Sequence, residues 1–186
     1  MVLEEESMEW NDNQSFWKLC EAGDVEGVQA AIANGADVNE ANEEGDVDAI
    51  AEAFENGEEF NEESDYYSYD RGSTGLMYAL RGYHNNVVQI LLEHPQIDVN
   101  KVDHDGRSAL DWALDHDDNH EGVATLLARD DLTTTTINHR SHNGLTPIMF
   151  AVHNNLVKCF HLLLTNPLVD LDTRDNYRMT PQMARM

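Results

Sequence analysis

The sequence predicts an all-α solenoid, that is, a stack of helix–turn–helix units joined by short extended turns. The main observation is an eight-residue frame: glycine, any residue, Ser or Thr, any residue, an aliphatic residue, two further residues and alanine. The frame occurs at residues 72–79, 106–113 and 144–151, and a partial copy begins at Arg178. An apolar stripe at helical spacing follows each complete frame. Segments that repeat in this way over 34 to 38 residues are typical of stacked repeats.

Each frame is expected to begin the first helix of a unit. The hydroxyl groups of Thr74, Ser108, Thr146 and Thr180 can accept hydrogen bonds from the free N–H groups of a first helical turn. Proline follows two of them, at the first helical position, where its fixed φ angle suits a helix. The small alanine at the end of each frame lets neighbouring helices approach closely. The frames therefore predict both where the first helices begin and which face they bury.

A second helix and an extended link complete each unit. Apolar stripes predict second helices that include residues 87–92, 123–127 and 162–164. Extended links are expected after them, at residues 97–100, 137–138 and 169–172. The distance from Asn100 to Gly106 recurs from Asn138 to Gly144. The Asp and Asn side chains of these links are expected to satisfy backbone donors in turns.

This pattern resembles the ankyrin repeat, whose unit of about 33 residues contains the core Thr-Pro-Leu-His-x-Ala. The segment most similar to it is 144–164, which begins Gly-Leu-Thr-Pro-Ile-Met-Phe-Ala, and residues 19–39 look like the family's first, capping repeat. The histidine of the core is replaced by Met77, Asp111 and Met149. The resemblance covers residues 14–186 and implies an ankyrin-repeat solenoid.

The expected organisation has one irregular region. Residues 1–13 form an acidic N-terminal segment, and the stack comprises a capping repeat, a compressed irregular repeat, three regular repeats and a partial one: 14–41, 42–70, 71–103, 104–141, 142–175 and 176–186. In the irregular repeat we expect a helix near residues 46–56, followed by an acidic, tyrosine-containing loop or short turn at 57–71. A disordered insertion is the alternative. The tyrosines suggest either a recognition or phosphorylation site, or rings that cover apolar helix edges.

The charge is concentrated in the N-terminal third. The chain has a formal net charge of −25, and residues 1–70 contain 22 Asp and Glu against the single base Lys18. Such a surface repels phosphate, so nucleic acid and anionic membranes are not expected as partners. It would attract a protein with a basic surface, unless the charge only keeps the chain soluble.

The compartment is predicted from what the sequence contains at its start and along its length. The N-terminal residues are acidic, where a secretory signal would be basic and then apolar. No apolar run approaches the roughly 18 residues that a membrane span needs. We therefore expect an intracellular protein, cytoplasmic or nuclear.

The sequence predicts no catalytic residues, no metal site and no cofactor, so the chain is not expected to be an enzyme. It contains neither a glycine-rich phosphate loop nor a Gly-x-Ser-x-Gly elbow. His116 and His120 are four residues apart, as in helical zinc pairs, but they fall in an expected loop. Cys20 and Cys159 lie in apolar helical patterns and are predicted to be buried.

The resemblance implies a protein–protein interaction module, a scaffold or adaptor that binds its partner on a concave surface of turns and first helices. The residues expected at exposed positions of that surface are Arg71, Tyr78, Lys101, His104, Arg107, Asp111, Arg140, His142 and Met149. Arginine and tyrosine are enriched in the residues that dominate interface energies. We therefore expect the largest contributions from Arg71, Tyr78, Arg107 and Arg140.

Two other functions remain open. The last unit is incomplete, which would leave residues 162–164 and Met183 poorly covered. The alternative is therefore that the chain is the recognition arm or a fragment of a larger signalling or ubiquitin-ligase protein, with further repeats or a partner at its C-terminal end. Asn39 and Asn100 also resemble asparagines that are hydroxylated in other ankyrin proteins, unless they serve only as hydrogen-bonding residues of the turns.

Overall fold

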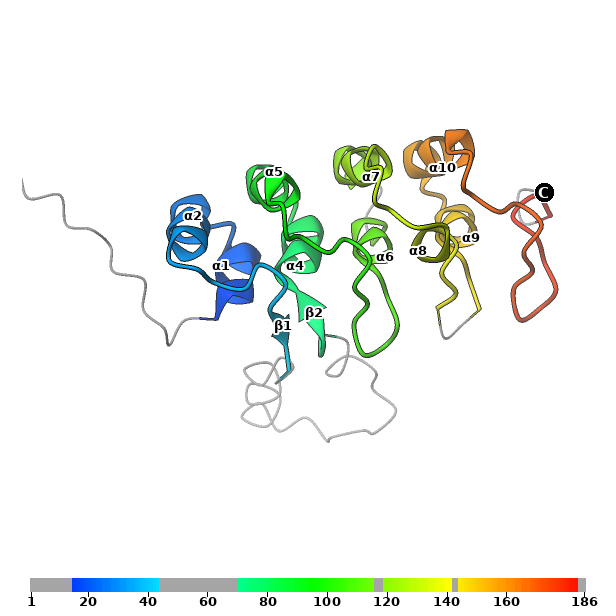
Figure 1. Cartoon of the computed structure of the whole chain (residues 1–186). Coiled ribbons are helices and arrows are strands. Elements are labelled where there is room, and N and C mark those ends of the chain that lie inside the picture. The colour runs from blue at the N-terminus through cyan, green and yellow to red at the C-terminus, as the bar shows by residue number, and fades with distance from the viewer. Residues whose placement is uncertain (1–14, 44–69, 116–118, 142–143, 184–186) are drawn as a thin grey trace, which may run out of the picture.

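The computed structural model describes residues 15–43, 70–115, 119–141 and 144–183. Figure 1 shows two layers of helices, stacked side by side along the chain. The first-helix layer contains α1 (Phe16–Ala22), α4 (Gly75–Arg81), α6 (Ala109–Ala113) and α9 (Pro147–His153). The second layer contains α2 (Val25–Ala33), α5 (Asn85–Glu93), α7 (His120–Leu127) and α10 (Val157–Thr165). The acidic segment 1–13 and the helix expected near 46–56 lie outside the described residues.

The expected hydroxyl caps form at one frame and are absent at another. The Ser108 hydroxyl accepts a hydrogen bond from the Asp111 N–H (3.3 Å), and the Ser108 N–H donates to Asp111 Oδ2 (2.8 Å). This reciprocal pair satisfies free donors at the start of α6. At α9, by contrast, the buried Thr146 hydroxyl has no hydrogen-bond partner among the described residues, so its expected cap is wrong. After Thr180 the described residues form only a turn, at 181–183.

The core lies between the two helix layers. Ala79, Ala113 and Ala151 are fully buried, as the close approach of first helices requires. Leu91, Leu126 and Leu163 occupy equivalent positions of the second helices and are also fully buried. Burial of each such leucine contributes about 1.5–3 kcal/mol to stability. The prediction that Cys20 and Cys159 are buried is confirmed.

The links between units are held by asparagine side chains. Asn39 Nδ2 donates to the carbonyl of Gln96 (2.7 Å), and its Oδ1 accepts from the Asp98 N–H (2.8 Å). Asn100 bonds in the same way to the backbone of Asp131 and Thr133, and Asn138 to that of Leu168 and Asp170. Each asparagine thus joins its own link to the link of the next unit.

One link contains a short helix, although the sequence predicts an extended backbone there, at residues 137–138. Ile137 is the last residue of the short helix α8 (Thr134–Ile137). The Thr133 hydroxyl accepts a hydrogen bond from the Thr136 N–H at 3.1 Å, which caps this helix at its start. The run of threonines before Ile137 therefore supplies a local alternative to the extended backbone.

Hairpin-like turns precede the first helices. Strand β1 (Ala41–Asn42) pairs antiparallel with β2 (Ser73–Thr74), so that Ala41 faces Thr74 and Asn42 faces Ser73. In the next turn Val102 forms a single bridge with Ser108. Figure 1 shows these turns projecting from the stack on the side of the first-helix layer.

Candidate partner-binding surface

The projecting turns and the adjoining first helices form the candidate surface, which we call the turn edge. Its described turn residues are 41–43, 70–74, 101–107, 139–141 and 173–178. Turn 102–107 has two backbone hydrogen bonds, from Asp103 N to Arg107 O and from Gly106 N to Asp103 O, both 2.9 Å. Turns 140–145 and 174–179 repeat both bonds at the equivalent residues. The backbone therefore presents side chains of successive turns in the same way.

Asp103 organises the turn before α6 from the inside. Its carboxylate is completely buried and accepts hydrogen bonds from the Arg107 N–H (2.7 Å), Arg107 Nε (3.0 Å) and Trp112 Nε1 (2.8 Å). Such bonds offset the free-energy cost of burying a charge. The Arg107 guanidinium also lies 4.5 Å from the centre of the Trp112 ring. The position of Arg107 is thus fixed by a carboxylate and an aromatic face together.

Aromatic rings line the first helices beneath the turn edge. Trp17 stacks on Tyr78 with 5.1 Å between ring centres, and Tyr78 lies 5.7 Å from Trp112. Tyr78 is only 2% exposed, and its hydroxyl accepts a hydrogen bond from Asn42 Nδ2 at 2.7 Å. The expectation that Tyr78 is an exposed contact residue is therefore wrong: its ring packs between neighbouring first helices.

The other expected contact residues fall into three groups. Arg71, Lys101, His104 and Arg140 are exposed on the turn edge, as expected. Arg107 and Asp111 are half-buried, because the former packs on Trp112 and the latter caps α6. Met149 is 3% exposed, so its expected exposure is wrong: it faces the packed side of α9. His142 lies outside the described residues.

Three exposed residues of turn 174–179 were not among the expected contact residues, namely Arg174, Tyr177 and Arg178. Tyr177 is 85% exposed, and the two arginines are exposed beside it. Arg178 has φ 64°, a left-handed conformation in which Gly106 (75°) and Gly144 (74°) occupy the equivalent positions. The signal was present in the sequence, because Arg178 replaces the glycine of the frame.

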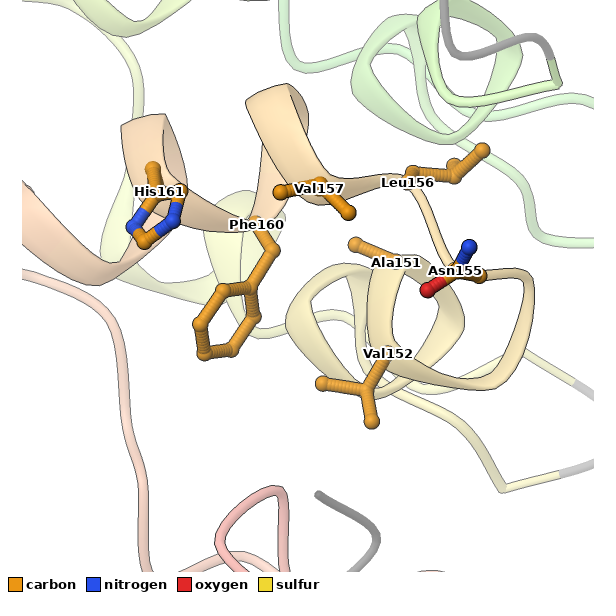
Figure 2. Close-up of a pocket in the computed structure, with 7 residues that line it drawn as sticks. All are labelled: Ala151, Val152, Asn155, Leu156, Val157, Phe160 and His161. Carbon is orange, nitrogen blue, oxygen red and sulfur yellow. The ribbon is translucent and has the colours of Figure 1, made fainter.

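The end face of the stack, beside α9 and α10, is hollowed and carries exposed apolar side chains. One cavity, of about 230 Å³, is lined by residues of α9, of α10 and of the loop between them. Figure 2 shows these residues, with the Phe160 ring beside Val152. A second cavity, of about 320 Å³, shares Phe160 and includes Leu164 and Pro181. Leu164 is 38% exposed and Met183 46%, as expected, whereas Leu163 is fully buried. Neither lining includes an acidic or basic side chain other than His161.

Two observations among the described residues bear on nucleophilic and metal chemistry. Burial raises the pKa of the Cys20 thiol to about 12, so this group is protonated and unreactive at neutral pH. Burial also raises the pKa of Asp111, against the opposing effects of the Ser108 hydrogen bonds and of His139. Within the described ranges, no three His, Cys, Asp or Glu side chains are grouped so that they could hold a metal ion.

Paired helices in two layers, joined by projecting turns, define the chain as a helical-repeat solenoid. It belongs to the ankyrin-repeat family: a model of three ankyrin repeats matches residues 16–136, and a model of a single ankyrin repeat matches residues 143–176. Repeats of this family are generally protein–protein interaction modules and are typically not catalytic. A search of curated proteins found no match to the chain. None of the helices described is long and apolar enough to cross a membrane.

Proposed function

We propose that this protein is a scaffold or adaptor module that binds a partner protein on the turn edge. The observation that carries the proposal is the series of exposed basic side chains, Arg71, Lys101, His104 and Arg140, on turns that project from the same side of the stack. Arginine is enriched among residues that dominate interface energies. On the opposite side of the stack, the exposed residues of the second helices are mostly uncharged, and Lys158 is the one lysine or arginine among those that the structure describes.

The anchoring of these side chains supports the proposal. Arg71 Nε donates to the carbonyl of Glu43 at 3.1 Å, and Arg140 Nε donates to the carbonyl of Gly144 at 3.2 Å. Side chains that are already ordered lose less conformational entropy when a partner binds. The turn edge is therefore suited to a rigid contact with little rearrangement.

The test is capture of partners from cell lysate by the full chain and by variants, with quantification by mass spectrometry. Arg71→Ala combined with Arg140→Ala removes two exposed cations from the turn edge. Lys158→Ala removes an exposed cation from α10, in the second layer, and is the matched control. We expect that partners captured by the Lys158→Ala control are captured about tenfold less, or less still, by the variant with both arginines replaced. Equal capture by all three proteins would exclude the turn edge as the binding surface.

The remaining predictions about partners are separate from this surface. A basic partner surface was inferred from the charge of residues 1–70, many of which lie outside the described residues, and it stays a prediction. The same holds for the recognition arm of a larger signalling or ubiquitin-ligase protein. For Asn39 and Asn100, the hydrogen bonds to the next unit are sufficient to explain the residue type. Their hydroxylation also stays a prediction, which mass spectrometry of natively expressed protein can test.

A further inference from the structure

We propose that the last two turns bind an acidic segment of the partner protein, through a patch that consists of Arg140, Arg174, Tyr177 and Arg178. We call these four residues the C-terminal turn patch. The inference rests on the proposed function, since it assumes that the turn edge is the binding surface, and it adds the chemical class of the bound segment. Three independent features of the patch support it.

The first feature is that its arginines are oriented but not neutralised. Arg140 Nε donates to the carbonyl of Gly144 (3.2 Å), and Arg174 Nη1 donates to that of Arg178 (3.0 Å). Within the described ranges, Asp and Glu pair at 4.0 Å or less with Arg81, Arg107 and Arg129, but not with an arginine of the patch. A guanidinium has five donors, so one bond to a carbonyl leaves donors for a carboxylate.

The second feature is that the carboxylate nearest in sequence is turned inward. Asp175 Oδ1 accepts hydrogen bonds from the N–H groups of Tyr177 and Met179, both at 2.8 Å. The acid of this turn is thus used by the backbone, while the arginines on either side of it are exposed. Arg140 Nη2 lies 3.4 Å from Asn176 Oδ1, which connects the two turns into one patch. The patch thus brings three arginines together in a chain whose formal net charge is −25.

The third feature is backbone strain at Arg178. A side chain other than glycine is disfavoured at φ 64°, yet the two equivalent turns have glycine and this one has arginine. Strained residues of this kind are concentrated at functional sites. Beside it, the Tyr177 side chain is 85% exposed and can cover the apolar part of a bound segment.

A peptide is favoured over a nucleic acid as the ligand. Arginine and tyrosine bind phosphates and bases as well as carboxylates and apolar side chains, so the patch alone allows both. A long polyanion, however, must also approach the rest of a strongly acidic protein, whereas a short acidic segment contacts only the patch. We therefore assign the patch to a partner's Asp- and Glu-containing segment.

The experiment is a selection of short random peptides, displayed on phage, against the full chain. Enriched peptides are then synthesised, and their affinities are measured by fluorescence anisotropy at two salt concentrations. We expect enriched peptides to be rich in Asp and Glu, and their affinity to fall as salt rises. Arg140→Ala and Arg174→Ala should each weaken binding about fivefold to tenfold, while Lys158→Ala leaves it unchanged.

Arg178→Gly separates binding from structure. Glycine is favoured at φ 64°, and the carbonyl that accepts from Arg174 is retained, so the thermal midpoint should not fall. The affinity for the enriched acidic peptide should nevertheless fall about fivefold. A lower affinity accompanied by a lower midpoint would mean that Arg178 has a structural role, which would contradict its place in the patch.

The outcomes distinguish the inference from the function on which it rests. If the enriched peptides are neutral or basic and lose binding in Arg71→Ala or Arg140→Ala, the assignment of an acidic segment is overturned, while the turn edge stays the binding surface. Enriched peptides that are insensitive to every turn-edge change would overturn both. If no peptide is enriched, or if an oligonucleotide of equal charge binds more tightly than the peptide, the assignment of an acidic segment is overturned.

Discussion

Turns 102–107 and 174–179 have the same backbone but use it differently. Both contain the same pair of hydrogen bonds, and in both an aspartate, Asp103 or Asp175, accepts from backbone N–H groups of its own turn. Asp103 additionally binds the Arg107 and Trp112 side chains, so that turn 102–107 is anchored in the core. Among the described residues, Asp175 makes no hydrogen bond to another side chain, and the arginines on either side of it are exposed.

The difference shows how one repeat can serve stability or recognition. In turn 102–107 the Arg107 guanidinium contacts a buried carboxylate and an aromatic ring, and the Arg107 side chain is only 22% exposed. In turn 174–179 the equivalent of the frame glycine is itself an exposed arginine. Changes in the first turn should therefore alter mainly the free energy of unfolding, and changes in the second mainly binding.

The largest expected effect is that of Asp103→Ala. The change leaves the Trp112 N–H and the Arg107 guanidinium without their buried acceptor, which should lower the free energy of unfolding by about 3–5 kcal/mol. Urea denaturation followed by circular dichroism measures it. Asp105→Ala, in the same turn, is the control and should stay within about 0.5 kcal/mol of the wild type. Similar losses in both variants would mean that the Asp103 network does not anchor the turn.

Asn100→Ala should have the next largest effect. Its side chain makes three hydrogen bonds to the following unit, with the backbone of Asp131 and Thr133 and with the Thr136 hydroxyl. At about 0.5–1.5 kcal/mol each, their loss should cost about 2 kcal/mol in the same urea experiment. Asn154→Ala removes only a bond within its own helix end and is the matched control. If both variants lost equal stability, the links would not couple the units.

The repeat and its turns could be predicted from the sequence because they depend on local signals. The frame glycines, the hydroxyl at Ser108 and the leucine stripes each act within a few residues. The burial of Tyr78 and Met149 could not be predicted in this way, since it depends on which neighbouring helix covers each side chain. The role of Asp103 could not be predicted from local signals either, because its partner Trp112 is nine residues away. The exposed Arg178 could have been predicted, because it stands where the three complete frames have glycine.

Two substitutions at the left-handed position of the turns should have smaller effects on stability, in opposite directions. Arg178→Gly relieves a strained backbone but also makes the unfolded chain more flexible, so stability should be unchanged or higher by up to about 1 kcal/mol. Gly106→Ala introduces that strain in turn 102–107, where the new methyl group would meet only the His139 ring at an ordinary contact distance of 3.5 Å. It should cost about 1 kcal/mol. Thermal denaturation of the two variants tests the pair, and a loss of stability in Arg178→Gly would contradict the comparison.

The smallest effect should be the pH dependence of stability that Asp111 contributes, in the unit that follows turn 102–107. Burial raises the pKa of Asp111 above its ordinary value of 3.8, whereas the equivalent residue after turn 140–145 is the non-titrating Met149. A carboxyl whose pKa is higher in the folded state contributes stability below its unfolded pKa and loses that contribution as pH rises through the folded value. The stability of the wild type relative to Asp111→Asn should therefore fall as pH is raised from about 3.5 to 7. Urea midpoints of the two proteins across this range measure the difference. A difference that does not change with pH would show that Asp111 is ionised in the folded protein as readily as in the unfolded chain, with its hydrogen bonds to Ser108 fully offsetting its burial.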